Sequence, residues 1–309
     1  MIINFLYLGI GLIILIFSSE ILIRGSIRLA KRFHVSEFLI GVLIISLGTS
    51  LPELSSSVNA MLHQHSDIVV GSLIGSNIAN ILLIMSTTVI LCPILKISKD
   101  QYFQIYSNIG MVVLLCLLGF FSIIINFFIG LIFLIILMMI MFYETKFNAV
   151  QIEKGLNTKE TNIIVAIFLI IIGLVGLIFG ADLFVNSAII LAKKLNISEA
   201  IIGITLVAFG TSLPELTVGV VAGLRKKTGF ALGNILGSNL YNIFGILGIS
   251  ALIDDIIIPI RIASFDHYVL LITTLFISLC IIILKKIPRI VGVIGLISYF
   301  SYILYLFYS

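Results

Sequence analysis

One hexapeptide occurs twice in this chain: Gly-Thr-Ser-Leu-Pro-Glu stands at residues 48–53 and again, 162 residues later, at residues 210–215. The match extends without a gap from residues 34–84 to residues 196–246, where about two in five positions are identical. A second shared pattern, Gly-Ser-Asn-x-x-Asn, follows each copy at the same offset. A duplicated unit is the economical explanation, so the fold must accommodate two related halves.

The chain is too apolar for a soluble protein. Of its 309 residues, 61% are hydrophobic and only 10% are charged, and the mean hydropathy is +1.29, whereas an ordinary soluble domain is about 25% charged. This composition excludes a soluble enzyme and predicts an all-α polytopic membrane protein with ten transmembrane helices. The predicted spans are residues 4–29, 36–62, 68–91, 103–124, 127–144, 162–191, 198–224, 229–252, 265–284 and 289–308. The net charge of +4 is too small to suggest a nucleic-acid partner.

A polar linker divides the predicted spans into two sets of five. The first five-helix repeat covers residues 1–145, with its repeated segment at about 35–84, and the second covers residues 162–309, with its repeated segment at about 197–246. Residues 146–161 join them. Because an odd number of spans separates equivalent points, the second copy must enter the membrane upside down. Inverted repeats are a recurrent transporter architecture, with the substrate site near the bilayer midplane.

The distribution of lysine and arginine predicts the orientation, since these residues prefer the cytoplasmic side. With both termini outside the cytoplasm, 15 of the 18 basic residues lie on the cytoplasmic side, and the linker 146–161 is cytoplasmic. The three on the other side are Lys193, Lys194 and Arg261. Lys31 and Arg32 fall inside whereas their repeat partners Lys193 and Lys194 fall outside, which also favours inversion. We therefore expect an integral protein of the plasma (inner) membrane.

Each hexapeptide places a proline and a glutamate in the middle of a predicted span. Pro52 and Pro214 each remove a helix donor and clash with the carbonyl four residues earlier, and broken backbone is tolerated in a bilayer only where it lines a cavity or is buried in protein. An intramembrane carboxylate is unfavourable by at least about 2–3 kcal/mol and marks a functional site by default. Glu53 and Glu215, with freed carbonyls and nearby hydroxyls, predict an oxygen-rich site for hard cations. The alternative is a protonated glutamate bonded to a neighbouring helix.

The third and eighth predicted spans carry the second pair of polar segments. Ser76 and Asn80 share a helix face, as do Ser238 and Asn242, because each pair is spaced i,i+4. We expect the side-chain oxygens of these four residues to point at the cation. For Asn77 and Asn239, a ligand role and simple helix packing both stay open.

These paired segments resemble the two α-repeats of the sodium/calcium exchanger family, within the calcium/cation antiporter superfamily, and the short linker resembles its prokaryotic members. The resemblance implies calcium–sodium antiport, with the first and sixth spans sliding past a rigid core. It implies that Glu53 and Glu215 ligate both ions, and that Thr49, Ser50, Thr211 and Ser212 add carbonyl and hydroxyl ligands. The further implied ligands are the backbone carbonyls of Ser46 and Ala208 and the side chains of Ser76, Asn80, Ser238 and Asn242. No cofactor is implied, and the expected partners are inorganic cations and the lipid bilayer, with no protein partner inferable.

One residue departs from the pattern of many relatives. Position 242 holds Asn where potassium-dependent relatives in particular carry Asp, so the site here has two carboxylates instead of three. The departure puts potassium co-transport in doubt and bears on ion stoichiometry.

Several alternatives stay open at this point. The chain could couple calcium, or another divalent cation, to protons, although proton-coupled relatives typically carry a GNxxE pattern in place of GTSLPE. An intramembrane carboxylate-dependent enzyme and a passive channel are further alternatives. Glu20 and Asp182, at repeat-equivalent positions, are expected to bond helix to helix or, for Glu20, to pair with Arg24; gating is the other interpretation. For His63-Gln64-His65 a metal site is the weaker interpretation, because no further ligand is nearby in the sequence.

Overall fold

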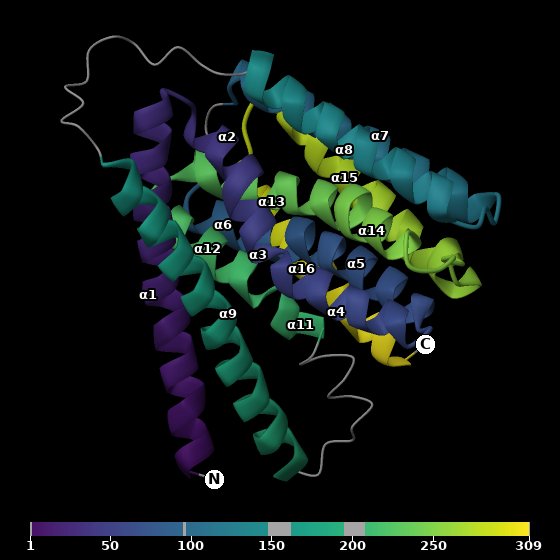
Figure 1. Cartoon of the computed structure of the whole chain (residues 1–309), viewed down its shortest axis with the longest axis horizontal. Coiled ribbons are helices and arrows are strands. Elements are labelled where there is room, and N and C mark those ends of the chain that lie inside the picture. The colour runs from purple at the N-terminus through teal and green to yellow at the C-terminus, as the bar shows by residue number, and fades with distance from the viewer. Residues whose placement is uncertain (1, 95–96, 148–161, 195–207, 309) are drawn as a thin grey trace.

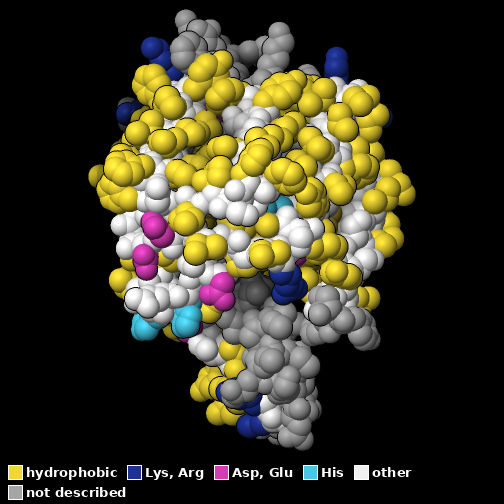
Figure 2. All heavy atoms as spheres, turned by 90° about the vertical axis from the view of Figure 1, so that its right-hand side faces the viewer, with side chains coloured by type: hydrophobic (Ala, Val, Ile, Leu, Met, Phe, Trp, Pro, Cys, Tyr) yellow, Lys and Arg dark blue, Asp and Glu magenta, His cyan; other side chains and the backbone are white. Residues whose placement is uncertain are grey.

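The computed structural model describes all residues except 1, 95–96, 148–161, 195–207 and 309. In those residues the secondary structure is helical, apart from two isolated β-bridges. Eight of the described helices are long and apolar enough to cross a membrane, or nine when one pair bent by 43° counts as a single span. On the face in Figure 2, hydrophobic side chains form a broad band with acidic and histidine side chains gathered below it. The protein is therefore a multi-pass integral membrane protein.

The helices follow the chain in two similar series. The first half holds α1 (Ile2–Phe33), α2 (Glu37–Ile40), η1 (Gly41–Ile45), α3 (Ser46–Thr49), α4 (Leu51–Leu62), α5 (Ser66–Ala79), η2 (Asn80–Met85), α6 (Ser86–Leu91), α7 (Lys99–Phe120) and α8 (Phe127–Phe147). The second half holds α9 (Ile163–Lys194), α11 (Ala208–Thr211), α12 (Leu213–Leu224), α13 (Thr228–Leu240), η4 (Tyr241–Leu247), α14 (Gly248–Ala251), η5 (Ile262–Asp266), α15 (His267–Leu284) and α16 (Arg289–Tyr308). The η segments are short π-helical stretches that continue the adjoining α-helices.

Nine of the ten predicted spans coincide with described helices, counting the bent pair as one. The predicted span 198–224 is described only from Ala208 onward, so the count of ten stays a prediction. Boundaries differ by a few residues for local reasons. The helix expected at 103–124 begins at Lys99, because Ser98 and Gln101 form a capping box, and ends at Phe120, just before Ser122 adopts a left-handed φ of 51°.

The two longest helices, α1 and α9, form a pair at one side of the molecule (Figure 1). They run antiparallel and approach closely at glycines: a Cβ at Gly11 would stand 2.8 Å from the backbone nitrogen of Phe184, and one at Gly173 would stand 2.7 Å from the Cβ of Leu22. Small residues permit such contact between membrane helices. The two helices therefore pack closely against each other along their length.

The centre of the bundle is formed by the two repeat-equivalent spans Ser66–Leu91 and Thr228–Ala251. In the most apolar 18-residue stretch of each, 72% and 94% of the residues are buried inside the protein, against 22–44% in the other long spans. The remaining helices surround these two spans, and the polar segments of the sequence therefore lie at the protein centre and away from lipid.

Contacts between the halves recur with the two halves exchanged. The β-bridge between Ile94 and Ile287 has its counterpart in the bridge between Ile256 and Ile125, which are the same positions displaced by 162 residues. The turns after α4 and α12 match as well, because Gln64 and Lys226 both adopt a left-handed φ, of 62° and 57°. The two halves of the chain therefore make equivalent contacts with each other.

Candidate cation site

Each Gly-Thr-Ser-Leu-Pro-Glu copy interrupts its helix at the serine. Ser50 has φ −83° and ψ 6°, and Ser212 has φ −87° and ψ 4°, so each falls between a short helix and a new one. The prolines stand in the first turn of the new helices, where a missing N–H is harmless. Glu53 and Glu215 then lie in the same first turns, at the positive end of the helix dipole, which favours a buried carboxylate.

Each carboxylate is held by hydroxyls from the other half of the chain. Ser50 Oγ donates to Glu215 Oε1 at 3.2 Å, and Thr49 lies beside the same carboxylate. Reciprocally, Thr211 and Ser212 lie beside Glu53. The two glutamates are 2% and 1% exposed, they interact electrostatically, and the Oε2 atom of each has no hydrogen-bond partner in the described part of the chain. Two buried carboxyl groups are thus oriented, and one oxygen of each has no described partner.

The predicted serine ligands are also buried beside the breaks. Ser212 Oγ donates to Ser76 Oγ at 3.3 Å, which brings α5 to the α11–α12 break. Ser238 is fully buried and its Oγ lacks a partner among the described residues. The Ser46 carbonyl already accepts a hydrogen bond from the Ser50 N–H, at 3.1 Å, and Thr49 Oγ1 lies 3.3 Å from the same oxygen, so a cation bound there would have to displace or share the Ser50 donor. Ala208 begins α11, and its side chain lies outside what is described.

Four asparagines form a second reciprocal network. Asn80 Nδ2 donates to Asn239 Oδ1 at 3.0 Å, and Asn242 Nδ2 donates to Asn77 Oδ1 at 2.9 Å. Asn77 Nδ2 in turn donates to the backbone oxygen of Asn239 at 3.3 Å. All four are at most 1% exposed. The amide N–H groups of Asn80 and Asn242 are engaged in these bonds, whereas their Oδ1 atoms have no partner among the described residues. Asn77 and Asn239 thereby orient the two predicted ligands.

This network gives a testable expectation for Asn77→Ala. Without the acceptor Oδ1, the amide of Asn242 is free to turn, and the loss of one buried hydrogen bond is worth about 0.5–1.5 kcal/mol, or roughly two- to tenfold in cation affinity. The measurement is the calcium dependence of thermal unfolding in detergent. Asn108→Ala is the matched control, because Asn108 is an equally buried asparagine that donates to the backbone of Gln104 and Leu236. Equal losses of affinity in both variants would contradict an orienting role for Asn77.

Asn234 is a residue that the repeat comparison missed. It is fully buried on α13, and its Oδ1 accepts a hydrogen bond from Thr49 Oγ1 at 3.1 Å. The equivalent position in the first half is Ser72, so the two halves differ here and an identity between repeats offered no signal. Asn234 makes the surroundings of the two carboxylates unequal.

The chemistry of the assembled site suits hard cations. Its oxygens come from two carboxylates, several hydroxyls and two oriented amides, a donor set typical of calcium and other hard ions. Among the described residues there is no cluster of three or more His, Cys, Asp or Glu side chains that could hold a metal.

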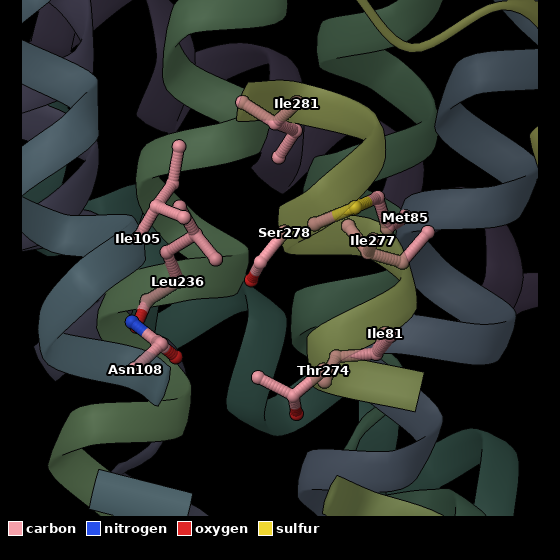
Figure 3. A pocket seen from close by; sticks show the side chains of 9 residues that line it. All are labelled: Ile81, Met85, Ile105, Asn108, Leu236, Thr274, Ile277, Ser278 and Ile281. Carbon is pink, nitrogen blue, oxygen red and sulfur yellow. The ribbon is translucent and has the colours of Figure 1, made fainter. Parts of the chain in front are cut away.

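A small cavity of about 10 Å³ lies elsewhere, between η2, α7, α13 and α15 (Figure 3). Its lining is mainly aliphatic, with Asn108, Thr274 and Ser278 as the polar members. It contains none of the predicted ligand residues, so it is separate from the carboxylate site.

Comparison with known proteins identifies the family. The family model described as sodium/calcium exchanger protein matches residues 3–146 and again residues 165–308. The chain belongs to the sodium/calcium exchanger family. Members of this family are transporters, so this protein is a membrane transporter and not an enzyme.

Relatives within the family are similar along most of the chain. The sodium/calcium exchanger MaX1 of Methanosarcina acetivorans is 32% identical, over 81% of this chain and 83% of its own. An uncharacterised membrane protein of Methanocaldococcus jannaschii is 37% identical, over 80% of each chain. The solved structure of the sodium–calcium exchanger NCX_Mj superimposes with a TM-score of 0.88 at 33% identity and covers 99% of both chains. The chain thus has the fold of a prokaryotic-type exchanger.

Proposed function

We propose that this protein is a secondary active antiporter that exchanges calcium for sodium by alternating access at the Glu53–Glu215 site. The observation that carries the proposal is the pair of buried carboxylates, each held by hydroxyls of the opposite half and each keeping one oxygen without a described partner. Binding one divalent cation or several monovalent cations would relieve the repulsion between the carboxylates. Both kinds of cation would be bound by the same ligand oxygens. A site of this kind favours exchange, because one kind of cation must leave before the other can bind.

The proposed architecture is ten spans in two inverted five-helix repeats. The reciprocal β-bridges, hydroxyl–carboxylate bonds and asparagine bonds support two equivalent halves packed about a two-fold axis. The bias of lysine and arginine supports both termini outside the cytoplasm, in the plasma membrane. Inversion lets the same site open to either side when the two halves exchange conformations.

The identity of the two exchanged ions, calcium and sodium, is inferred from relatives and from the ligand set together. MaX1 and NCX_Mj are both named as sodium/calcium exchangers, and NCX_Mj has been solved after soaking with sodium and with calcium or strontium. Asn242, where a third carboxylate would stand in potassium-dependent relatives, is a neutral amide in this chain, which favours exchange without potassium.

The decisive experiment is uptake of radioactive calcium into proteoliposomes under imposed ion gradients. We expect uptake when the lumen holds sodium and the bath does not, and no uptake when sodium is equal on both sides. A potassium gradient alone should have no effect. Uptake driven by a pH gradient and indifferent to sodium would overturn the proposal in favour of the proton-coupled alternative. Gradient-independent calcium leak would indicate a channel. Liposomes without protein provide the background.

A further inference from the structure

Glu20 on α1 makes an ion pair that reaches a different helix. Arg24, one turn away, lies 2.7 Å from Glu20 Oε1, as expected for an i,i+4 pair. Arg225, at the end of α12, binds the same carboxylate in a bidentate manner: its Nη2 lies 2.8 Å from Oε1, and its Nε donates to Oε2 at 2.9 Å. The Glu20 side chain is only 17% exposed. This ion pair connects the α1–α9 pair to α12, the helix that carries Glu215.

The repeat supplies an equivalent pair at the other end of the molecule. Displaced by 162 residues, Glu20 corresponds to Asp182 on α9, and Arg225 corresponds to His63 at the end of α4. The local geometry is the same: the N–H groups of His65 and Lys227 bond to the carbonyls of Ala60 and Ala222, at 2.9 and 2.8 Å. Each half thus presents an acid on its long helix and a base at the end of the helix that follows the break.

Only one of the two pairs is joined in this structure. Within the described part of the chain, Asp182 Oδ1 accepts from Asn186 at 2.9 Å, and His63 Nδ1 lies 2.8 Å from the carbonyl oxygen of Asn59. Packing is unequal in the same sense, because α1 packs along α12 whereas the described residues of α9 make no comparable contact with α4. In Figure 1 the ends of α1 and α9 near the N-terminus diverge from the bundle. The long helix pair α1–α9 is therefore joined to the bundle at the Arg225 end.

We propose that Glu20–Arg225 and Asp182–His63 are alternative latches, each of which closes one side of the membrane while the other is open. The inference rests on the alternating access proposed above. In the conformation opposite to this one, α9 moves onto α4, Asp182 leaves Asn186 for His63, and Arg225 releases Glu20. With the orientation argued from the basic residues, the arginine latch closes the cytoplasmic side and the histidine latch closes the external side.

The two latches differ in their response to protons. Arginine stays charged at all physiological pH values, whereas an unperturbed histidine changes charge between about pH 5 and 8. A histidine that carries a proton binds an acid more firmly than a neutral one does, so we expect external acid to favour closure of the Asp182–His63 latch and with it the state open to the cytoplasm. Other charged or titratable groups lie near His63: His65 is in the same turn, Asp67 is in the first turn of α5, and Asp254 and Asp255 follow α14, which packs on α4. A test must separate His63 from these neighbours.

Mutual exclusion of the two latches is the first test. Cysteines replace Glu20 and Arg225, or Asp182 and His63, in a full chain whose Cys92, Cys116 and Cys280 are serines, and a short bifunctional thiol reagent is added to proteoliposomes. We expect each pair to cross-link and each cross-link to stop calcium uptake. In the variant with all four cysteines, a molecule linked at one pair should not be linked at the other. Doubly linked molecules, or undiminished uptake after the Asp182–His63 link, would overturn the latches.

Proton dependence is the second test. Surface ion pairs contribute about 0.2–1 kcal/mol, equivalent to roughly 1.4- to 5-fold in a conformational equilibrium. His63→Arg should remove a rate change of that size between external pH 8 and 6, and Arg225→His should introduce one on the cytoplasmic side. His65→Gln is the matched control and should keep the wild-type response. Loss of the response in His65→Gln but not in His63→Arg would contradict the assignment.

These tests are separable from the ion-exchange proposal. Cross-link exclusion reports conformations and holds for any transported ion, so an error in the sodium–calcium assignment leaves it intact. Sodium-driven uptake that survives both cross-links would instead count against the latches alone.

Discussion

Glu53→Gln and Glu215→Gln are each expected to abolish calcium–sodium exchange. These glutamates supply the negative charge of the site itself, so their replacement should weaken cation binding far more than the roughly two- to tenfold expected for Asn77→Ala, which removes only an orienting hydrogen bond. A glutamine keeps the size and one oxygen but removes a negative charge that is 1–2% exposed. The hydroxyls that now donate to each carboxylate would face a weaker acceptor. We expect sodium-driven calcium uptake to fall to the level of empty liposomes.

Thermal unfolding in detergent distinguishes a lost site from a misfolded protein. Without ions, each variant should be at least as stable as the wild type, because the repulsion between two buried carboxylates is gone. Addition of calcium should then fail to raise the unfolding midpoint, since ligand stabilisation follows binding affinity. Asp67→Asn removes the same charge from an exposed position and should leave both measurements unchanged. Full exchange by either glutamine variant would refute the paired-carboxylate site.

Gly233→Ala is expected to destabilise the whole core. At this glycine α13 crosses α2 and η1 backbone to backbone: a Cβ would lie 3.0 Å from the nitrogen of Val42, 3.1 Å from the Cα of Gly41 and closer still to the carbonyl oxygen of Phe38. Overpacking of a core is unfavourable by about 1–3 kcal/mol, and backbone atoms cannot move aside as side chains do. We expect a lower unfolding midpoint and weaker calcium binding, because the neighbouring Asn234 shifts with the helix.

Gly110→Ala is the control for this substitution. Gly110 lies on the exposed face of α7, and no described atom outside its own helix lies within 4 Å of the added Cβ. There the greater helix propensity of alanine, worth up to about 1 kcal/mol, should leave the protein equally or more stable. The two variants are therefore predicted to shift the midpoint in opposite directions. If Gly233→Ala were as stable as Gly110→Ala, the close crossing would be wrong.

Predictions from the sequence succeeded where the signal was local. The described spans follow continuous apolar runs, and the breaks fall inside the Gly-Thr-Ser-Leu-Pro-Glu segments because proline and the residues around it disturb the helix in any context. Helix ends were less accurate, as at Lys99, since a capping box extends a helix beyond its apolar run. Asn234 was not predicted as part of the site, because its partner Thr49 is 185 residues away in the chain and the equivalent position in the first half, Ser72, holds serine.

The sequence alone determined the membrane class, the duplication and the two intramembrane glutamates, because composition, offset and the position of a charge in an apolar run need no knowledge of packing. Only the tertiary structure decided which groups meet. Ser50 bonds to Glu215 of the other half, Asn77 orients Asn242, and Glu20 reaches Arg225. These partners are 165 to 205 residues apart in the chain. Their meeting depends on how the two halves pack, and no local pattern encodes that geometry.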